Sequence, residues 1–408
     1  MTDDAINLAN WDTAPLNRTS FLNICDLIPV EIVERGDQPA TQIDDDQREL
    51  GAIAVPTTTG DYSTVEEVLL STETDGFLVL RKNRIVCERY FNGMKADTLH
   101  LAQSVSKSVT GTLAGIYLDR GLIDRNALVT DYVPELLNSG YANATLDHVL
   151  NMQTGVKFTE NYLDPNAEFA LLDIASGWKA PRNDCDPKSI RDLLVSIKGD
   201  QSHGKNFQYR SIDTDVLAWV CERVGNDSLS KLISDEIWSK IGAEHDASFT
   251  VDREGTALAD GGFNASLRDF GRFAQIYLNR GVANGSQIVS PGWVEECQRG
   301  DSEAFRICNG EFLMHYPRAG YSNQWWVVDG KRGSFSARGV FGQFIYVDPS
   351  ADLVIVKLST WPTFLDQDRM LDTYRMAEAI GTQLSFGASP KAADPYSNVE
   401  HSGENIVG

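Results

Sequence analysis

The alternation of apolar and polar positions divides the chain into stretches typical of strands and stretches typical of helices. Apolar and β-branched residues fill 76–80 and 85–91, and the polar residues 81–84 between them predict the turn of a β-hairpin. From about residue 99 to 260 the apolar positions recur every three to four residues, which indicates helices. Further strands are predicted at 324–328, 333–338, 342–347 and 353–358, followed by a last helix at about 368–385.

One predicted helix stands out by its composition. Its apolar positions follow the helical period and stop before Gly121, a residue type that often ends helices. These positions are Val105, Val109, Leu113 and Ile116. The small residues Gly111, Ala114 and Gly115 share another face, which suits deep burial against neighbouring elements. The other predicted helices cover 145–152, 188–198, 212–224, 228–241 and 266–280.

The order of these elements predicts an α/β fold, with an antiparallel sheet flanked by helices and interrupted by a mainly helical insertion. Such an arrangement leaves a cleft between the two parts, where ligand sites tend to lie. We expect an α/β region formed by 66–118 and 261–386, and a mainly helical region at 119–260. Residues 1–65 are interpreted as an N-terminal extension over the surface, and 387–408 as a loose tail.

The charge and composition of the chain exclude several classes of binding partner and cofactor. The formal net charge of −22 over 408 residues argues against nucleic acid or an anionic membrane, because both would repel the protein. The first residues are acidic and lack the features of a secretory signal, so we expect a cytoplasmic protein. The six cysteines and six histidines show no metal-binding spacing, and neither a metal nor another cofactor is expected.

The candidate chemistry begins with a serine and a lysine three residues apart. This spacing puts both side chains on one helix face, where a lysine can take the proton of a serine nucleophile if its pKa is lowered. The motif occurs three times, at Ser104–Lys107, Ser202–Lys205 and Ser228–Lys231. An isolated match is more often structural than catalytic. Only the first follows a predicted hairpin and opens the small-residue helix, so Ser104 is the predicted nucleophile.

The sequence from Gln103 to Thr112 resembles the nucleophile helix of the β-lactamase-like, penicillin-recognising serine hydrolases. That superfamily includes class C β-lactamases, D-alanyl-D-alanine peptidases, family VIII carboxylesterases and 6-aminohexanoate-dimer hydrolases. The resemblance implies the β-lactamase/transpeptidase-like fold and an acyl-enzyme on Ser104. Its second motif matches Tyr209-Arg210-Ser211, which implies that Tyr209 relays a proton and that Ser211 contacts the site. The alternative is that Tyr209 is a rim residue and that Ser211 caps the next helix.

The third motif of this superfamily matches residues 337–340. Gly339 would let a substrate backbone lie close to the strand. The amide groups of Ser104 and Val340 would form the oxyanion hole. The usual cation of the first position is replaced by Ala337, and Arg338 is expected to point away because side chains alternate along a strand. This departure disfavours β-lactamase and peptidase activity.

A resemblance to the 6-aminohexanoate-dimer hydrolases spans about 70–362 and includes Tyr162-Leu163-Asp164-Pro165 and Ser176-Gly177-Trp178. In that family the tyrosine matching Tyr162 reaches the scissile amide, and the acidic residue matching Asp173 contacts the free amino end of the substrate. A carboxylate in a partly desolvated pocket is a suitable partner for an ammonium. The alternatives are packing for Tyr162 and a surface or helix-end position for Asp173. Asp260 is a further candidate for the cleft.

The sequence therefore predicts a serine hydrolase that cleaves short linear amides of the 6-aminohexanoate-oligomer type and short-chain esters. The open alternatives are a carboxylesterase without amidase activity, a β-lactamase or D-alanyl-D-alanine peptidase, and a catalytically inactive binding domain. The expected partner is a small-molecule substrate, and a homodimer is one open possibility for its assembly.

Overall fold

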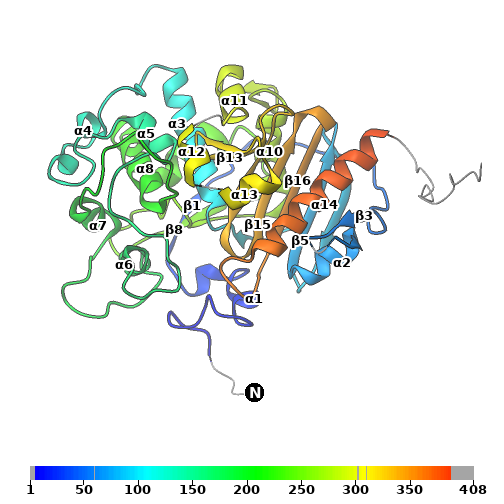
Figure 1. Cartoon of the computed structure of the whole chain (residues 1–408), viewed down its shortest axis with the longest axis horizontal. Coiled ribbons are helices and arrows are strands. Elements are labelled where there is room, and N and C mark those ends of the chain that lie inside the picture. Colours follow the sequence, from blue (N-terminus) through cyan, green and yellow to red (C-terminus); the bar gives the residue numbers. More distant parts are fainter. Residues whose placement is uncertain (1–4, 59, 301–302, 309, 387–408) are drawn as a thin grey trace, which may run out of the picture.

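An eight-stranded sheet forms the centre of the α/β part in the computed structural model, which describes residues 5–58, 60–300, 303–308 and 310–386 (Figure 1). Its strands pair antiparallel except for the edge strand β2, which runs parallel to β6. In spatial order they are β12 (Gly320–Ser322), β13 (Trp325–Asp329), β14 (Ser334–Gly339), β15 (Gln343–Asp348), β16 (Leu353–Ser359), β5 (Thr74–Arg81), β6 (Arg84–Tyr90) and β2 (Asp44–Asp45). The predicted hairpin and the four late strands are thereby confirmed to within two residues.

Both faces of this sheet are covered, and the alternation of side chains along β5 explains how. Leu78 and Leu80 pack into a core with helices α3 (Val105–Asp119) and α10 (Leu267–Leu278). Phe77 and Val79 pack into a second core with α14 (Gln367–Phe386) and α2 (Val65–Ser71). Because successive strand residues point to opposite faces, one apolar strand serves two cores. Figure 1 shows α14 lying across the sheet.

The mainly helical region surrounds α8 (Ser211–Gly225), which contacts α3, α5 and α9 and so ties this region to the nucleophile helix. Its other helices are α4 (Val129–Tyr132), η2 (Pro134–Asn138), α5 (Leu146–Leu150), α6 (Glu168–Ala175), α7 (Ile190–Ser196), α9 (Leu229–Ile233) and the π-helical turn η3 (Ser234–Trp238). The predicted helix at 228–241 is therefore an α-helical turn followed by a π-helical one. Helix α6 was absent from the predicted elements.

A four-stranded antiparallel sheet joins distant parts of the chain in the order β1 (Val30–Val33), β8 (Ala247–Thr250), β9 (Phe263–Ala265) and β7 (His100–Leu101). The remaining elements are α1 (Asn17–Ser20), η1 (Ile24–Asp26), the hairpins β3 (Ala54–Pro56) with β4 (Tyr62–Thr64) and β10 (Val282–Ala283) with β11 (Ser286–Gln287), α11 (Pro291–Cys297), α12 (Glu303–Cys308), α13 (Gly310–His315), η4 (Val340–Gly342) and η5 (Pro349–Ala351). Within the described part of the chain, no helix has both the length and the apolar character needed to cross a bilayer.

The N-terminal segment is more deeply integrated than a surface extension. Trp11 and Phe21 are buried in the core that contains α3, and strand β1 pairs with β8. The Asn17 side-chain amide donates to the Trp361 carbonyl oxygen at 2.8 Å. The expectation that 1–65 only wraps the surface missed these large apolar side chains, whose burial requires a place in the core. The predicted tail at 387–408 lies outside the described residues.

Candidate active site

Ser104 sits at the turn between strand β7 and helix α3. Gln103 before it adopts a left-handed conformation with φ of 49°, and Ser104 is the N-cap residue of the helix. A serine at this position usually accepts a hydrogen bond from the first helical turn. Here the hydroxyl makes no such cap and instead accepts a hydrogen bond from Lys107 Nζ at 2.9 Å. The nucleophile predicted from the sequence is therefore free of a capping role and lies against the predicted lysine.

Lys107 is buried and has oxygen atoms on several sides. Its Nζ donates to Ser211 Oγ at 3.1 Å, to the Asp260 carbonyl oxygen at 2.8 Å and to Asp260 Oδ2 at 3.2 Å. Asp260 therefore faces the lysine through both its main chain and its carboxylate. Of the sequence-predicted residues, Ser104, Lys107, Ser211 and Asp260 form one connected cluster.

The charge state of Lys107 differs from the sequence expectation. Burial alone lowers the pKa of Lys107, but negative charge on Tyr209, Asp260 and Glu160 raises it by more, so the pKa of this lysine lies above its ordinary value. A base of lowered pKa was expected because the sequence could not show a carboxylate in contact with Nζ. In the resting site Lys107 is an ammonium that donates to Ser104.

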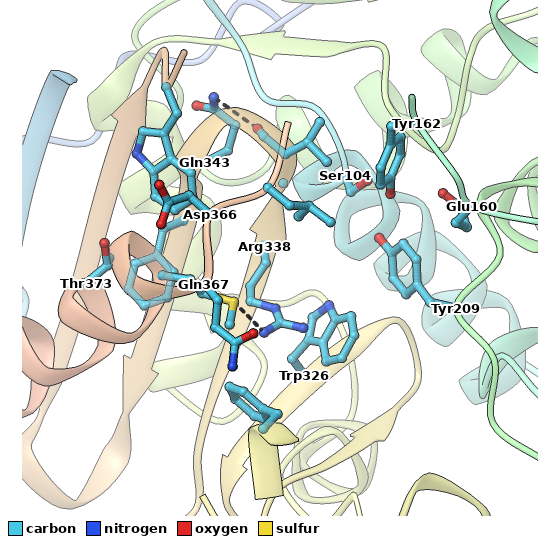
Figure 2. A pocket seen from close by; sticks show the side chains of 18 residues that line it. Ser104, Glu160, Tyr162, Tyr209, Trp326, Arg338, Gln343, Asp366, Gln367 and Thr373 are labelled. Carbon is cyan, nitrogen blue, oxygen red and sulfur yellow. Dashed lines mark hydrogen bonds between the residues drawn. The ribbon is translucent and has the colours of Figure 1, made fainter. Parts of the chain in front are cut away.

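Tyr209 precedes helix α8, and its phenol points toward Ser104 (Figure 2). Burial raises the pKa of Tyr209 above its ordinary value, and Lys107 and the hydrogen bond with Ser104 offset only part of this rise. The ring stacks on Trp326 with centroids 5.2 Å apart, and Lys107 Nζ lies 5.0 Å from the ring centroid. The phenol is therefore held between an indole and an ammonium, next to the predicted nucleophile.

Glu160 is a member of the cluster that the sequence did not reveal. Its carboxylate accepts a hydrogen bond from the backbone amide of Ser211, at the N-terminus of α8, and burial raises its pKa. The N-cap of α8 is Arg210, whose side chain makes no cap, so the alternative that Ser211 caps this helix is wrong. The position of Glu160 two residues before Tyr162 gave no motif by which to find it.

The strand beside Ser104 approaches the turn at 102–103 very closely. A Cβ on Gly339 would lie 2.7 Å from the Ala102 carbonyl oxygen and 2.9 Å from the Gln103 Cβ. Gly339 was expected to let a substrate backbone lie close to the strand, whereas the backbone that requires the glycine is the turn carrying the nucleophile. The amide groups of Ser104 and Val340 have no acceptor among the turn, loop and side-chain hydrogen bonds of the described residues.

The expectation that Arg338 points away from the cleft was wrong. Arg338 lines the same cavity as Ser104, whereas Ala337 packs into the core with α3. Side chains do alternate along β14. Ser336, two residues before Arg338 and on the same face, hydrogen-bonds Tyr374 of α14 at 2.6 Å. The prediction assigned the wrong face of the strand to the cleft, because the wide part of the cleft lies on the face of β14 that α14 covers.

The cleft has two parts, and Ser104, Tyr162 and Val340 line both of them. The wide part has a volume of about 460 Å³ and includes Tyr209, Trp326 and Arg338 (Figure 2). The narrow part, of about 20 Å³, is lined by Phe169, Leu172, Asp173, Ser176, Trp178, Ser211, Leu258 and Asp260, among others. Ser104 thus lies between a wide cavity and a much narrower one.

Asp173 is half-buried on helix α6 and faces the narrow part of the cleft. Burial raises its pKa to about 8, and Lys179, which offsets part of this rise, is itself paired with Asp12 at 2.6 Å. No side-chain hydrogen bond to the Asp173 carboxylate is seen within the described ranges. The carboxylate is thus desolvated and lacks a close positive partner.

Tyr162, which lines both parts of the cleft, packs against Phe364. Their rings stack with centroids 5.4 Å apart, and Tyr162 also contacts Phe169 edge to face. Tyr162 bonds Glu160, and burial raises its pKa well above the ordinary value for tyrosine. Neither Phe364 nor Trp326 was singled out from the sequence, because single aromatic residues are more often core than site.

The two other Ser-x-x-Lys matches are structural. Ser202 and Lys205 are exposed. Ser228 caps α9 by accepting from the Lys231 backbone amide at 3.3 Å, and the Lys231 side chain bonds Asp235. Neither lysine approaches its serine as Lys107 does, which supports the choice made from helix context.

The fold and this cluster are those of a serine hydrolase built on a Ser-x-x-Lys helix, and comparison with known proteins gives the family. The β-lactamase family model matches residues 66–379. The chain belongs to the β-lactamase family of serine hydrolases. It is 41% identical to the 6-aminohexanoate-dimer hydrolase of Paenarthrobacter ureafaciens over 380 residues, which cover 91% of this chain and 94% of that protein.

Two solved structures extend this comparison. A candidate 6-aminohexanoate-dimer hydrolase from Bacillus anthracis is similar with a TM-score of 0.85 and 29% identity, over 93% of this chain and 97% of that one. A family VIII carboxylesterase is similar with a TM-score of 0.57 and 18% identity, over 77% of this chain and 95% of that one. The predicted fold class and family are therefore confirmed. At 18% identity, the similarity to the carboxylesterase supports only the fold.

Proposed function

We propose that the protein hydrolyses short linear amides with a free terminal amine, of the 6-aminohexanoate-oligomer type, together with short-chain esters. The observation that carries the proposal is Asp173, a desolvated carboxylate without a close cation in the narrow cavity that also contains Ser104. An ammonium entering that cavity would form a charge-assisted hydrogen bond with it. The 41% identical relative bears a name that refers to such a substrate.

In the proposed acylation step, Ser104 Oγ attacks the scissile carbonyl carbon while its proton passes to the Tyr209–Lys107 pair. Because Asp260 and Glu160 stabilise the Lys107 ammonium, the pair loses its proton from Tyr209, which becomes a phenolate, while Lys107 stays protonated. Tyr209 is then the base, and Lys107 stabilises its negative charge. The amide groups of Ser104 and Val340 hold the developing oxyanion.

Collapse of the tetrahedral intermediate breaks the carbonyl carbon to nitrogen bond. Tyr209 returns the proton to the leaving nitrogen, so that an ester on Ser104 and a free amine result. Tyr162, which lines both parts of the cleft, is assigned to position the scissile nitrogen for this transfer. Water then hydrolyses the ester by the same steps in reverse, with Tyr209 accepting the proton of the water molecule.

The proposal is tested by comparing an amide with an ester in the same variants. We expect Asp173→Asn to lower kcat/KM for the linear 6-aminohexanoate dimer by about 10- to 100-fold, the worth of a hydrogen-bonded charge pair. Hydrolysis of p-nitrophenyl acetate, which has no ammonium, should change by less than about threefold on the same reasoning. Tyr162→Phe should likewise reduce amide cleavage more than ester cleavage.

Ser104→Ala serves as the blank, and a fluorophosphonate probe should label wild type but not this variant. If wild type cleaves p-nitrophenyl esters but no aminohexanoate amide, the amidase proposal is wrong and the protein is a carboxylesterase. Efficient turnover of a chromogenic cephalosporin would instead indicate a β-lactamase.

A further inference from the structure

Arg338 places a positive charge against aromatic rings in the wide part of the cleft. Among the described residues that line the wide part of the cleft, it is the only basic one. Its guanidinium lies 3.5 Å from the ring centroid of Trp326 and 5.1 Å from that of Phe312 (Figure 2). The charged group is therefore held flat against aromatic faces inside a cavity, in a fixed orientation.

The hydrogen-bonding capacity of this guanidinium is largely unused. A guanidinium carries five N–H donors. Arg338 donates to the Met370 sulfur at 3.1 Å, a weak acceptor, and it hydrogen-bonds the Tyr374 phenol, which is neutral. In the described ranges Arg338 forms no ion pair with a carboxylate. Of the two acidic side chains that line this part of the cleft, Asp366 is paired with Arg369 at 3.3 Å and Glu160 accepts a hydrogen bond from the Ser211 amide.

The position of Arg338 relative to Tyr209 assigns it to one side of the scissile bond. Trp326 stacks on Arg338 with one face, and its ring also stacks on Tyr209. Tyr209 returns the proton to the leaving group in the mechanism above, whereas Asp173 lies in the other part of the cleft. A substrate whose ammonium is directed toward Asp173 thus extends its leaving group into the wide part around Arg338.

We propose that Arg338 binds a carboxylate at the far end of the leaving group. The inference rests on the proposed function, because it assumes that a linear substrate extends through both parts of the cleft. The protein would then recognise substrates with an ammonium at one end and a carboxylate at the other, as in an ω-aminoacyl ω-amino acid. A planar guanidinium is suited to bidentate contact with a carboxylate, and the rings of Trp326 and Phe312 beside it hold it in place for that contact.

The experiment compares two substrates that differ only in this terminal charge. The linear 6-aminohexanoate dimer and its terminal carboxamide are hydrolysed by wild type, Arg338→Gln and Arg338→Lys. Arg369→Gln is the matched control, because it removes a cation near the cleft that does not line the cavity. p-Nitrophenyl acetate reports whether the Ser104 site remains intact in each variant.

We expect wild type to prefer the carboxylate over the carboxamide by about 10- to 100-fold in kcat/KM, mainly through KM. Arg338→Gln should abolish this preference by raising KM for the carboxylate alone, and Arg338→Lys should retain part of it. Arg369→Gln should retain it fully. Equal kcat/KM for both substrates in wild type would overturn the proposal. An equal loss on both substrates and on p-nitrophenyl acetate in Arg338→Gln would also overturn it, since that pattern indicates that Arg338 only supports Trp326 and Tyr209.

Failure of the proposed amidase function is distinguishable from failure of this inference. If wild type cleaves neither dimer, the amidase function is wrong, and the same comparison is made with the acetate esters of 6-hydroxyhexanoate and 6-hydroxyhexanamide. A preference for the carboxylate ester that disappears in Arg338→Gln would support the carboxylate site. Equal cleavage of the two esters by wild type would overturn it.

Discussion

Two lysines are buried in the described part of the molecule, and their surroundings shift their pKa values in opposite directions. Lys107 on α3 exposes 1% of its surface, and Lys357 on β16 exposes none. The pKa of Lys107 is raised, whereas burial lowers the pKa of Lys357 to about 7, with only partial compensation by Asp75. Equal burial therefore does not determine the charge of a lysine.

The contacts of the two ammonium groups explain the difference. Lys107 Nζ has the Asp260 carboxylate at 3.2 Å, with Tyr209 and Glu160 nearby. Lys357 Nζ meets only neutral acceptors, the Ser359 hydroxyl and the Thr72 carbonyl oxygen at 3.4 Å. A counter-charge within contact distance stabilises the ammonium, and hydroxyl or carbonyl dipoles alone do not offset its desolvation. Lys107 is thus equipped to remain charged during the reaction, while Lys357 is a structural lysine close to neutrality.

The largest expected effect separates the two lysines by function. Lys107→Met should reduce kcat/KM for p-nitrophenyl acetate by about 10³-fold or more, because the Tyr209 phenolate loses its cationic partner. Lys357→Met should leave this rate within about threefold of wild type, since Lys357 does not line the cleft. Steady-state kinetics on both variants, with circular dichroism as a folding control, checks this. Comparable losses in both variants would contradict the assignment.

The second prediction concerns stability and tests the neutral state of Lys357. Its folded pKa of about 7 lies below its ordinary value of 10.5, so the unfolded chain binds more protons between these two values. This lysine therefore makes the free energy of unfolding rise with pH in that window and costs stability below it. We expect the free energy of unfolding of Lys357→Met, relative to that of wild type, to fall by about 2 kcal/mol between pH 7 and pH 9.

Urea unfolding of both proteins at the two pH values measures this quantity. Because only the change between pH values is compared, the pH-independent loss of the contacts with Ser359 and Thr72 cancels. A difference that stays constant with pH would show that Lys357 keeps its ammonium in the folded protein.

The third prediction removes the counter-charge of Lys107. Asp260→Asn preserves the size of the side chain, but it takes away the negative charge that holds a proton on the Lys107–Tyr209 pair. The pKa of that pair should fall, and the acid limb of the kcat/KM profile should move to lower pH by about one to two units. Asp213→Asn is the control, because Asp213 is a buried carboxyl that accepts hydrogen bonds from Tyr141 and Thr154 rather than from Lys107. An equal shift in both variants would contradict a specific role for Asp260.

The same contrast explains which parts of the site the sequence could predict. The Ser104 helix follows from local patterns, whereas Tyr209 and the strand before Val340 follow from the resemblance to the superfamily. The structure brings all three together around one cleft. Asp260 was placed near the cleft but not against Lys107, since that contact joins residues 153 positions apart in the chain. The direction of a pKa shift depends on such contacts, so the raised pKa of Lys107 could not be predicted from the sequence.

The prediction that Arg338 points away from the cleft was wrong for a related reason. Strand alternation was predicted correctly, but the face of β14 that borders the wide cavity depends on where α14 and the loop at 362–366 close over the sheet. Gly339 was singled out correctly, yet its neighbour is the turn before Ser104, which lies more than two hundred residues away in the chain. Local periodicity therefore gives the elements, whereas the packing of distant segments decides what each side chain meets.

The last prediction applies the lesson of the two lysines to a carboxyl group. Asp173 resembles Lys357 in that burial without a close counter-charge shifts its pKa toward the neutral form, to about 8. A substrate ammonium would supply what Asp260 supplies to Lys107. Since kcat/KM reports the free enzyme, its value for the 6-aminohexanoate dimer should rise about tenfold more between pH 7 and pH 9 than its value for p-nitrophenyl acetate. In Asp173→Asn the two substrates should share one pH profile, and a persisting difference there would mean that another group binds the ammonium.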